Sequence, residues 1–278
     1  MTAQDAWSSP AARSPGGRQR SEWTVVPLRR PLARVRLYCL PWAGAGAAGF
    51  RDWARGLPEW VEVVAVALPG RERRLAEPAL DSVRRIADRL APVLLADAGE
   101  LPQALFGHSL GALVAHETAL RLTAAGAGPE LLVVSGSRAP HLPVRGEELH
   151  RLPDDASFLR ALRRLQPPGD AVLDHPELVS LLLPALLADF TAAETHHRPA
   201  RADLACPITA LYGTDDPLAL RSDLDAWGRC TTGGHSVHEV PGGHLFVMTH
   251  QRRVLNSVTD ALRRSGREHD DHDERGTT

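Results

Sequence analysis

The stretch Gln103-Ala104-Leu105-Phe106-Gly107-His108-Ser109-Leu110-Gly111 joins a short apolar run to a long helical pattern, Leu110–Ala125. It ends in the motif G-x-S-x-G, in which a serine sits on a sharp turn between a strand and a helix. Glycines flank the serine because side chains at those positions would keep the strand and the helix apart. The motif therefore predicts that the hydroxyl of Ser109 is presented at the edge of a sheet.

The chain around this stretch alternates apolar runs with amphipathic segments, which predicts an α/β fold with a mostly parallel central sheet flanked by helices. From about residue 138 to residue 200 the alternation stops, and two helical patterns, Ala156–Leu165 and Pro176–Glu194, replace it. An insertion of that length commonly serves as a lid. The predicted strands are Val35–Leu40, Val61–Leu68, Gln103–Phe106, Leu131–Ser135, Ile208–Tyr212 and, more weakly, Val237–Val240, and the other predicted helices are Phe50–Gly56, Val83–Ala96, Ser222–Trp227 and Phe246–Arg264.

The length of 278 residues fits one large α/β domain. Residues 1–22 are rich in Ser, Pro, Gly and Arg and lack apolar periodicity, whereas residues 267–278 are polar and acidic. We therefore expect a disordered leader at 1–22, a single domain at 23–266 with the lid insertion at about 138–200, and a disordered tail at 267–278.

Composition excludes several classes of protein. All 32 basic residues are Arg and they nearly balance 34 acidic residues, so no basic excess suggests nucleic acid or a membrane surface as a partner. The absence of Lys also excludes Schiff-base and Ser-Lys chemistry. No signal peptide and no run of about 18 apolar residues is evident. Three scattered cysteines fit neither a disulfide scaffold nor a thiolate metal site, so we expect a reduced, cytoplasmic protein.

A serine nucleophile needs a histidine to take its proton and a carboxylate to orient that histidine. In G-x-S-x-G hydrolases the chain order is Ser, acid, His. Asp215 and Asp216 follow one predicted strand, and His244 follows the next, at the strand ends where active sites of open α/β sheets lie. The residues themselves allow either aspartate to orient His244, with its neighbour bonding to the local backbone of the turn.

Two backbone N–H groups must also face the oxyanion that forms during acyl transfer. Leu110, directly after the serine, supplies the first. The second is expected from the small-residue loop Leu40–Gly46, at Ala43. A phosphate-binding loop is the competing interpretation of this segment, but the chain has no lysine for a Walker motif.

The chain has 13 histidines, and most are expected on the surface or in structural roles. His108 is expected to pack beneath the serine turn. The pairs His196-His197 and His235/His238 could be metal ligands, but no Cys, Asp or Glu stands at a matching spacing. We therefore predict neither a metal nor a cofactor.

Several motifs of the chain resemble those of the type II thioesterases that accompany polyketide synthases and nonribosomal peptide synthetases and have the α/β-hydrolase fold. The resemblance spans about Trp23 to Arg264. It implies that the acid is Asp216, the aspartate before proline. The chain departs from the family pattern at Trp42, where His is common, and at Ala45, where Gly is common. The motifs are Leu40–Gly44, Leu68–Arg74, Gly107–Gly111, Leu181–Phe190, Gly213–Pro217 and Gly242–His244.

The resemblance implies hydrolysis of aberrant or stalled acyl groups from the phosphopantetheine arm of acyl or peptidyl carrier proteins, an editing reaction of antibiotic biosynthesis. Ser109 would attack, His244 would act as base, and Ala43 and Leu110 would bind the oxyanion. The apolar run Leu181–Leu187, with Phe190, is interpreted as lid core or acyl-pocket wall. Candidate contacts to an acidic carrier protein, each also explicable as a solvated surface, are Arg71, Arg73 and Arg74 or Arg160, Arg163 and Arg164.

Two alternatives stay open on the sequence. The same catalytic residues would serve a chain-releasing thioesterase or a small-ester hydrolase. From another class of protein, an inactive adaptor could use the same fold only to bind carrier proteins, although an intact Ser109, Asp216 and His244 set argues against that.

Overall fold

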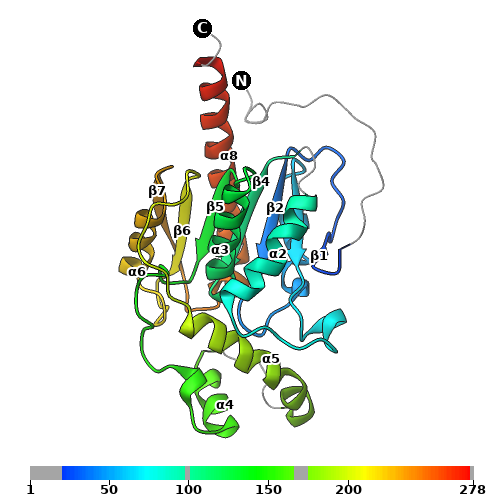
Figure 1. Ribbon diagram of the computed structural model, residues 1–278, viewed down its shortest axis with the longest axis vertical. Coiled ribbons are helices and arrows are strands. Elements are labelled where there is room, and N and C mark those ends of the chain that lie inside the picture. The colour runs from blue at the N-terminus through cyan, green and yellow to red at the C-terminus, as the bar shows by residue number, and fades with distance from the viewer. Residues whose placement is uncertain (1–20, 98–100, 166–174, 276–278) are drawn as a thin grey trace.

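A seven-stranded sheet forms the centre of the computed structural model, which describes residues 21–97, 101–165 and 175–275 (Figure 1). The strand order is β1-β3-β2-β4-β5-β6-β7. Only β1 pairs in antiparallel fashion, with β3, and all other neighbours are parallel. The predicted mostly parallel sheet is therefore confirmed. The strands are β1 (Thr24–Val25), β2 (Val35–Leu40), β3 (Val61–Val66), β4 (Gln103–His108), β5 (Leu131–Ser135), β6 (Ile208–Gly213) and β7 (His235–Val240).

Helices cover both faces of the sheet, which explains why its central strands are nearly continuous apolar runs. One apolar cluster packs α2, α3 and α6 against one face, and a second packs α1, α7 and α8 against the other. The helices are α1 (Trp53–Gly56), α2 (Val83–Asp97), α3 (Leu110–Ala124), α4 (Asp155–Arg163), α5 (Pro176–Thr195), α6 (Arg221–Asp225), α7 (Phe246–Thr249) and α8 (Gln251–Arg275), with short 3-10 helices η1 (Ala47–Phe50), η2 (Glu72–Arg74), η3 (Leu149–Arg151) and η5 (Ala226–Cys230).

The described residues of the predicted insertion between β5 and β6 form η3, α4 and α5, close to the predicted helix bounds. Figure 1 shows α4 and α5 beyond one end of the sheet, outside the layers that flank it. They share a small apolar cluster of their own, which includes Phe158, Leu162 and Leu186. The insertion thus packs largely on itself while its last helix reaches back to the main domain, where α5 contacts α3.

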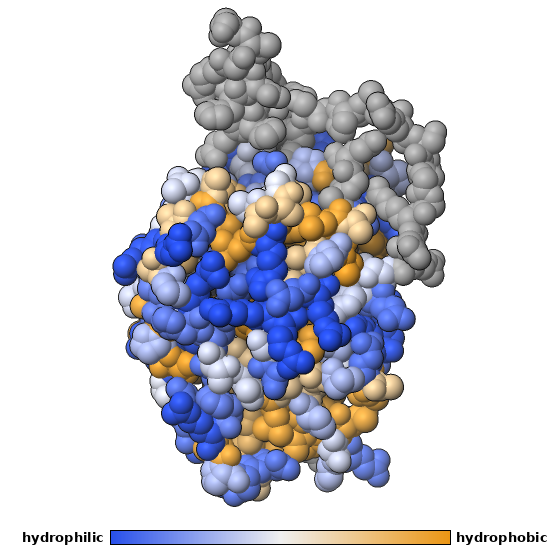
Figure 2. All heavy atoms as spheres, in the orientation of Figure 1, coloured by the Kyte–Doolittle hydropathy of each residue, from blue (hydrophilic) through white to orange (hydrophobic). Residues whose placement is uncertain are grey.

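One part of α5 is unusually apolar and exposed. By length and composition, α5 would be long and apolar enough to cross a membrane, a feature that the sequence analysis did not anticipate. Leu178 and Leu181 are exposed, and apolar surface gathers at the foot of Figure 2, over the insertion. However, the buried Asp189 of this helix is paired with Arg71 of the main domain. That pairing ties α5 to the protein as a packed helix.

The helical structure at the carboxyl-terminal end of the chain differs from expectation. The predicted helix Phe246–Arg264 is divided into α7 and α8, and α8 continues to Arg275, into the stretch expected to be a disordered tail. No Gly or Pro interrupts the chain between Arg267 and Arg275, so nothing in that composition ends a helix. Most of the predicted leader, residues 1–20, and residues 276–278 lie outside the described residues.

The strand order places two loops side by side. The chain runs from β2 outward to β3 and then returns past β2 to β4, so the direction in which successive strands are added to the sheet reverses between β2 and β4. Ligands of open α/β sheets bind beyond the carboxyl ends of the strands at such a point. The loop after β2 contains Ala43, and the turn after β4 contains Ser109.

Candidate active site

Ser109 lies on a strained turn between β4 and α3. Its φ is 53°, a value that residues other than glycine rarely adopt. A Cβ on Gly107 would lie 2.1 Å from the carbonyl oxygen of Gly111, and a Cβ on Gly111 would lie 2.2 Å from that of Leu40. Both flanking positions therefore exclude any side chain, for the steric reason expected from the motif. The N–H of Ser109 donates to the carbonyl of Ser135 at 2.8 Å and helps to hold the turn.

The structure brings Ser109, His244 and Asp216 into one hydrogen-bonded line. His244 Nε2 lies 3.0 Å from Ser109 Oγ. On the other side of the ring, Nδ1 lies 2.9 Å and 3.1 Å from the two carboxylate oxygens of Asp216. Asp216 is buried, and its Oδ1 also accepts the backbone N–H of Leu218 at 2.9 Å. The Asp216 carboxylate is thus held in place by its burial and by the N–H of Leu218, in addition to its contact with the imidazole.

Asp215 occupies a different environment from its neighbour. It is exposed, and its Oδ2 accepts the hydroxyl of Thr214 at 3.1 Å. Of the two aspartates that the sequence left open, only Asp216 therefore reaches His244. A carboxylate on Nδ1 favours the tautomer with its proton there, which leaves the lone pair of Nε2 directed at the serine hydroxyl. This arrangement allows His244 to accept the proton of Ser109.

His108 lies beneath the site, as the sequence predicted. Its ring centroid is 5.3 Å from that of His244 and 5.1 Å from that of Phe246, and its Nδ1 lies 2.9 Å from Ser135 Oγ. Burial, with a smaller contribution from His244, lowers the pKa of His108 well below its ordinary value. The ring is therefore neutral at neutral pH and supports His244 without placing a second positive charge against it.

The two residues predicted to supply oxyanion donors, Leu110 and Ala43, lie near Ser109. Leu110 is the first residue of α3, and the N–H at that position has no acceptor within its own helix. Ala43 lines a cavity together with Ser109 and His244. The two segments touch, because the position of a Cβ on Gly111 falls against the carbonyl of Leu40 at the start of the loop. Both residues thus lie beside the serine, where the sequence predicted them.

Two cavities, one larger than the other, meet at Ser109 and His244. They share Leu165, Phe190 and Leu218 as walls. The larger is lined by Leu110, Leu113, Val144 and Leu149 with charged groups that include Arg138, Arg145, Glu147 and Glu194, and the smaller by Trp42, Ala43, Leu162 and Leu245.

Phe190 both packs within the insertion and lines the cavities at the serine. It lines both cavities, and its ring packs edge-on against Phe158 of the insertion, 5.5 Å between centroids. The sequence did not identify the residues of η3 and of the segment before it that also reach the larger cavity. Only the apolar spacing of α5 signalled that the insertion helps to enclose the serine.

One predicted contact surface for a carrier protein is wrong. Arg71 and Arg74 are buried, at 4% and 6% exposure, and are paired with Asp189 and Glu77 respectively. Arg73 is exposed, but its guanidinium donates to backbone carbonyls of residues 21–24. Arg71 and Arg74 face inward because the folded chain supplies carboxylates and carbonyls there. The other cluster, Arg160, Arg163 and Arg164, is exposed at the end of α4.

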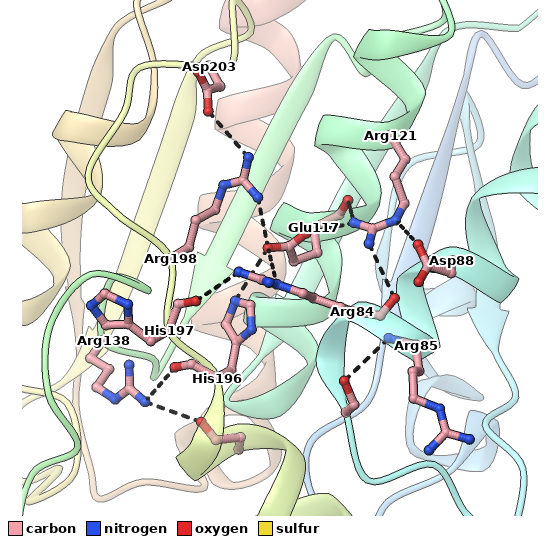
Figure 3. Close-up of polar contacts among 12 residues, drawn as sticks. Arg84, Arg85, Asp88, Glu117, Arg121, Arg138, His196, His197, Arg198 and Asp203 are labelled. Atoms are coloured by element: carbon pink, nitrogen blue, oxygen red, sulfur yellow. Dashed lines mark hydrogen bonds and ion pairs between the residues drawn. The ribbon is translucent and has the colours of Figure 1, made fainter.

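A second polar cluster surrounds Glu117 of α3, away from the serine (Figure 3). The buried Glu117 carboxylate accepts from Arg121 at 2.6 Å and from Arg198 at 3.2 Å. His196 Nε2 lies 3.6 Å from it, and burial lowers the pKa of His196 to about 4. His196 thus belongs to a structural cluster. Among the described residues, no group of three or more His, Cys, Asp or Glu side chains could hold a metal ion.

Comparisons with known proteins agree on one family. The family described as "Thioesterase domain" matches residues 35–262. The chain is 42% identical to thioesterase PikA5 of Streptomyces venezuelae over 84% of this chain and 82% of that protein. It is 34% identical to gramicidin S biosynthesis protein GrsT of Aneurinibacillus migulanus, over 88% and 95% of the two chains.

Solved structures are similar over nearly their whole length. The type II thioesterase BorB from the borrelidin biosynthetic cluster has a TM-score of 0.78 and 35% identity, covering 88% of this chain and 98% of that one. YbtT, a type II thioesterase from the yersiniabactin NRPS/PKS pathway, has a TM-score of 0.79 and 30% identity, covering 87% and 99%.

Proposed function

The chain belongs to the thioesterase family and hydrolyses thioesters, and on this premise we propose that Ser109, His244 and Asp216 remove aberrant or stalled acyl groups from carrier proteins of polyketide or nonribosomal peptide biosynthesis. The observation that carries the proposal is the hydrogen-bonded line from Ser109 through His244 to Asp216, set in cavities that the insertion helps to enclose. The substrate itself supplies the phosphopantetheine arm, so the reaction needs no further cofactor. We place this activity in the cytoplasm, with other biosynthetic enzymes.

The first half of the reaction forms an acyl-serine. His244 Nε2, 3.0 Å from Ser109 Oγ, takes the hydroxyl proton while Oγ bonds to the thioester carbonyl carbon. The carbonyl oxygen becomes an oxyanion, which the N–H groups of Ala43 and Leu110 stabilise. The buried Asp216 carboxylate stabilises the imidazolium that forms. The intermediate then collapses, the C–S bond breaks, and the pantetheine sulfur leaves with the proton held by His244.

The second half releases the acid. A water molecule gives a proton to His244 and bonds to the acyl carbon, and the same two N–H groups hold the second oxyanion. Collapse breaks the bond to Oγ, which recovers its proton from His244. A thiol has a pKa of about 8.5 and leaves readily, so oxyanion stabilisation contributes more to the first half than acid assistance does.

We place the docking site of the carrier protein at the exposed end of α4. Arg160, Arg163 and Arg164 lie there on the insertion, whose Leu162 and Leu165 line the cavity at the serine. Carrier proteins of these pathways are acidic, and guanidinium groups suit both carboxylates and the phosphate of the arm. The chain as a whole has a formal charge of only −2, so recognition rests on this local cluster rather than on net charge.

The test compares three substrate classes with the same acyl groups: acyl carrier proteins, free acyl thioesters of N-acetylcysteamine, and oxygen esters. We expect kcat/KM to be highest for short acyl groups on the carrier protein. Equal or better turnover of oxygen esters would favour the small-ester hydrolase. Activity only on full-length chains, with product release, would favour the chain-releasing enzyme, and wild-type turnover no greater than that of Ser109→Ala would leave only the inactive adaptor.

A further inference from the structure

We propose that Asp189 and Arg71 are positioning residues that couple helix α5 of the insertion to the oxyanion-binding loop, residues 42–46. The inference rests on the role proposed above for the N–H of Ala43. The two residues are far apart in the sequence and form a buried ion pair. We assign to this pair the role of holding the Ala43 N–H in place for the transition state.

Asp189 joins the two segments directly. Its side chain is fully buried, and its Oδ2 accepts the backbone N–H of Gly44 at 2.8 Å and Arg71 Nη1 at 2.6 Å. Its Oδ1 accepts Arg71 Nη2 at 2.8 Å. Because the N–H of Gly44 belongs to the peptide that links it to Ala43, this bond fixes the plane of that peptide. The carboxylate therefore orients the backbone one peptide away from the proposed oxyanion donor.

Arg71 completes the arrangement on the other side of the loop. Its Nη1 also donates to the carbonyl of Ala45 at 3.1 Å. One guanidinium and one carboxylate thus hold a backbone donor and a backbone acceptor of adjacent residues. The flat fork of arginine allows the two parallel bonds to Asp189 while leaving Nη1 in reach of the loop.

Helix α5 also contacts the loop through an apolar side chain. A Cβ on Gly44, whose φ is +77°, would lie 2.6 Å from Leu186 Cδ2, so Leu186 packs directly on that residue. Leu186 and Asp189 are three residues apart and share one face of the helix. Any shift of α5 along or around its axis would therefore move Gly44 and change the direction of the neighbouring N–H.

The residue after Arg71 holds the start of η1, which directly follows the same loop. Glu72 accepts the backbone N–H groups of Ala47 and Ala48 at 3.1 Å and 2.9 Å. It does so from a φ of 49°, a strained conformation for a residue other than glycine. The motif Leu68–Arg74, which the sequence could only associate with a family, thus has a physical role in holding the loop.

Changes to this buried ion pair should affect the stability of the fold and the catalytic rate differently. Replacing a buried ion pair by apolar residues of similar volume is often neutral for stability, whereas removing one partner leaves a buried charge unpaired and is strongly destabilising. No apolar pair, however, can accept the N–H of Gly44 or donate to Ala45. Removing both charges should therefore restore stability without restoring the geometry of the loop.

The experiment measures kcat and KM for S-propionyl-N-acetylcysteamine and inhibition by a trifluoromethyl ketone analogue, which forms an oxyanion-bearing adduct with a serine. In Asp189→Asn we expect kcat to fall about 10- to 100-fold with KM nearly unchanged, and the Ki of the ketone to rise by a similar factor. The matched control is Glu62→Gln, which removes one of the two carboxylates paired with buried Arg36, near the amino-terminal ends of β2 and β3, and should lower stability while keeping kcat.

The double variant Arg71→Met/Asp189→Leu separates positioning from stability. We expect its unfolding midpoint to exceed that of either single variant while kcat stays low. Recovery of wild-type kcat together with stability, or a loss of rate confined to KM, would overturn the inference. A wild-type enzyme that hydrolyses the thioester but resists the ketone would refute the proposed serine mechanism itself, and with it this role.

Discussion

The change Asp216→Asn tests whether the buried carboxylate sets the tautomer of His244. Asp216 Oδ1 accepts the N–H of Leu218 at 2.9 Å, and Oδ2 accepts Nδ1 of His244 at 2.9 Å. An asparagine must keep its oxygen toward Leu218 to satisfy that buried N–H, because its NH₂ group cannot accept it. The NH₂ then faces Nδ1 and favours the tautomer with its proton on Nε2, which cannot take the proton of Ser109.

The expected loss is large because the wrong tautomer removes the base without disturbing the fold. The corresponding loss of tautomer in serine proteases costs about 10⁴-fold in kcat, or about 5 kcal/mol in activation free energy. Asp215→Asn is the matched control, one residue away. Asp215 is exposed, and its side chain bonds only to Thr214 among the described contacts, so its change should leave kcat within about twofold.

Thiol release from S-propionyl-N-acetylcysteamine gives kcat for both variants, and urea unfolding shows whether each is folded. Substrate binding should be similar in the two, so the difference is expected in kcat rather than in KM. The tautomer explanation would fail if Asp216→Asn kept more than about a tenth of wild-type kcat while folded, or if Asp215→Asn lost as much.

Three further outcomes follow from the structure. Gly111→Ala should lower the free energy of unfolding by more than about 3 kcal/mol, since its Cβ would lie 2.2 Å from a backbone oxygen. The control Gly126→Ala places a Cβ with no atom within 4 Å and should cost only about 1–2 kcal/mol of backbone strain. Equal losses of stability in urea unfolding would contradict this prediction. Burial lowers the pKa of His116 to about 3 and that of His196 to about 4, below the value of about 6.5 in the unfolded chain. As the pH falls, the unfolded chain therefore binds protons before the folded protein does. Stability should fall below about pH 6.5, by up to about 1.4 kcal/mol per pH unit for each group. Stability that stays constant from pH 7 to pH 5 would be inconsistent with neutral buried rings, and His116→Asn should flatten the slope. Arg160→Glu/Arg164→Glu should raise KM for an acyl carrier protein and leave KM for the small thioester unchanged. Arg55→Glu, at an exposed residue of α1, should change neither KM. An unchanged KM for the carrier protein in the double variant would rule out docking on α4.

The sheet was predictable because both of its faces are covered. Strands such as Val61–Val66 are fully buried, and the sequence therefore shows them as apolar runs bounded by turn residues. The serine turn was predictable for a steric reason, since Gly107 and Gly111 are required by close backbone contacts that the motif reflects. The edge strand β7 was only weakly evident because most of its side chains are half-exposed and polar.

The choice between Asp215 and Asp216 could not be made from the residues alone. Both follow β6, and only the direction of the chain in the turn sends one carboxylate toward His244 and the other toward solvent. Family resemblance supplied what the residue pattern lacked.

The inward position of Arg71 was missed for a related reason. An arginine-rich segment usually lies in solvent, and its buried partner Asp189 stands 118 residues away in the chain. One signal was available: Asp189 is the sole charged residue within the mostly apolar stretch Leu178–Ala193. A lone carboxylate in an apolar helix predicts a buried partner, but not which of the 32 arginines supplies it.

The central claim is that Ser109 takes the acyl group from a carrier protein. Rapid mixing with a propionyl carrier protein, acid quenching and peptide mass analysis test it most directly. We expect a transient propionyl group on the peptide that contains Ser109, formed as free phosphopantetheine thiol appears on the carrier, and neither species with Ser109→Ala. Release of the free thiol at the wild-type rate by Ser109→Ala, with no acyl-peptide in the wild-type enzyme, would contradict the claim.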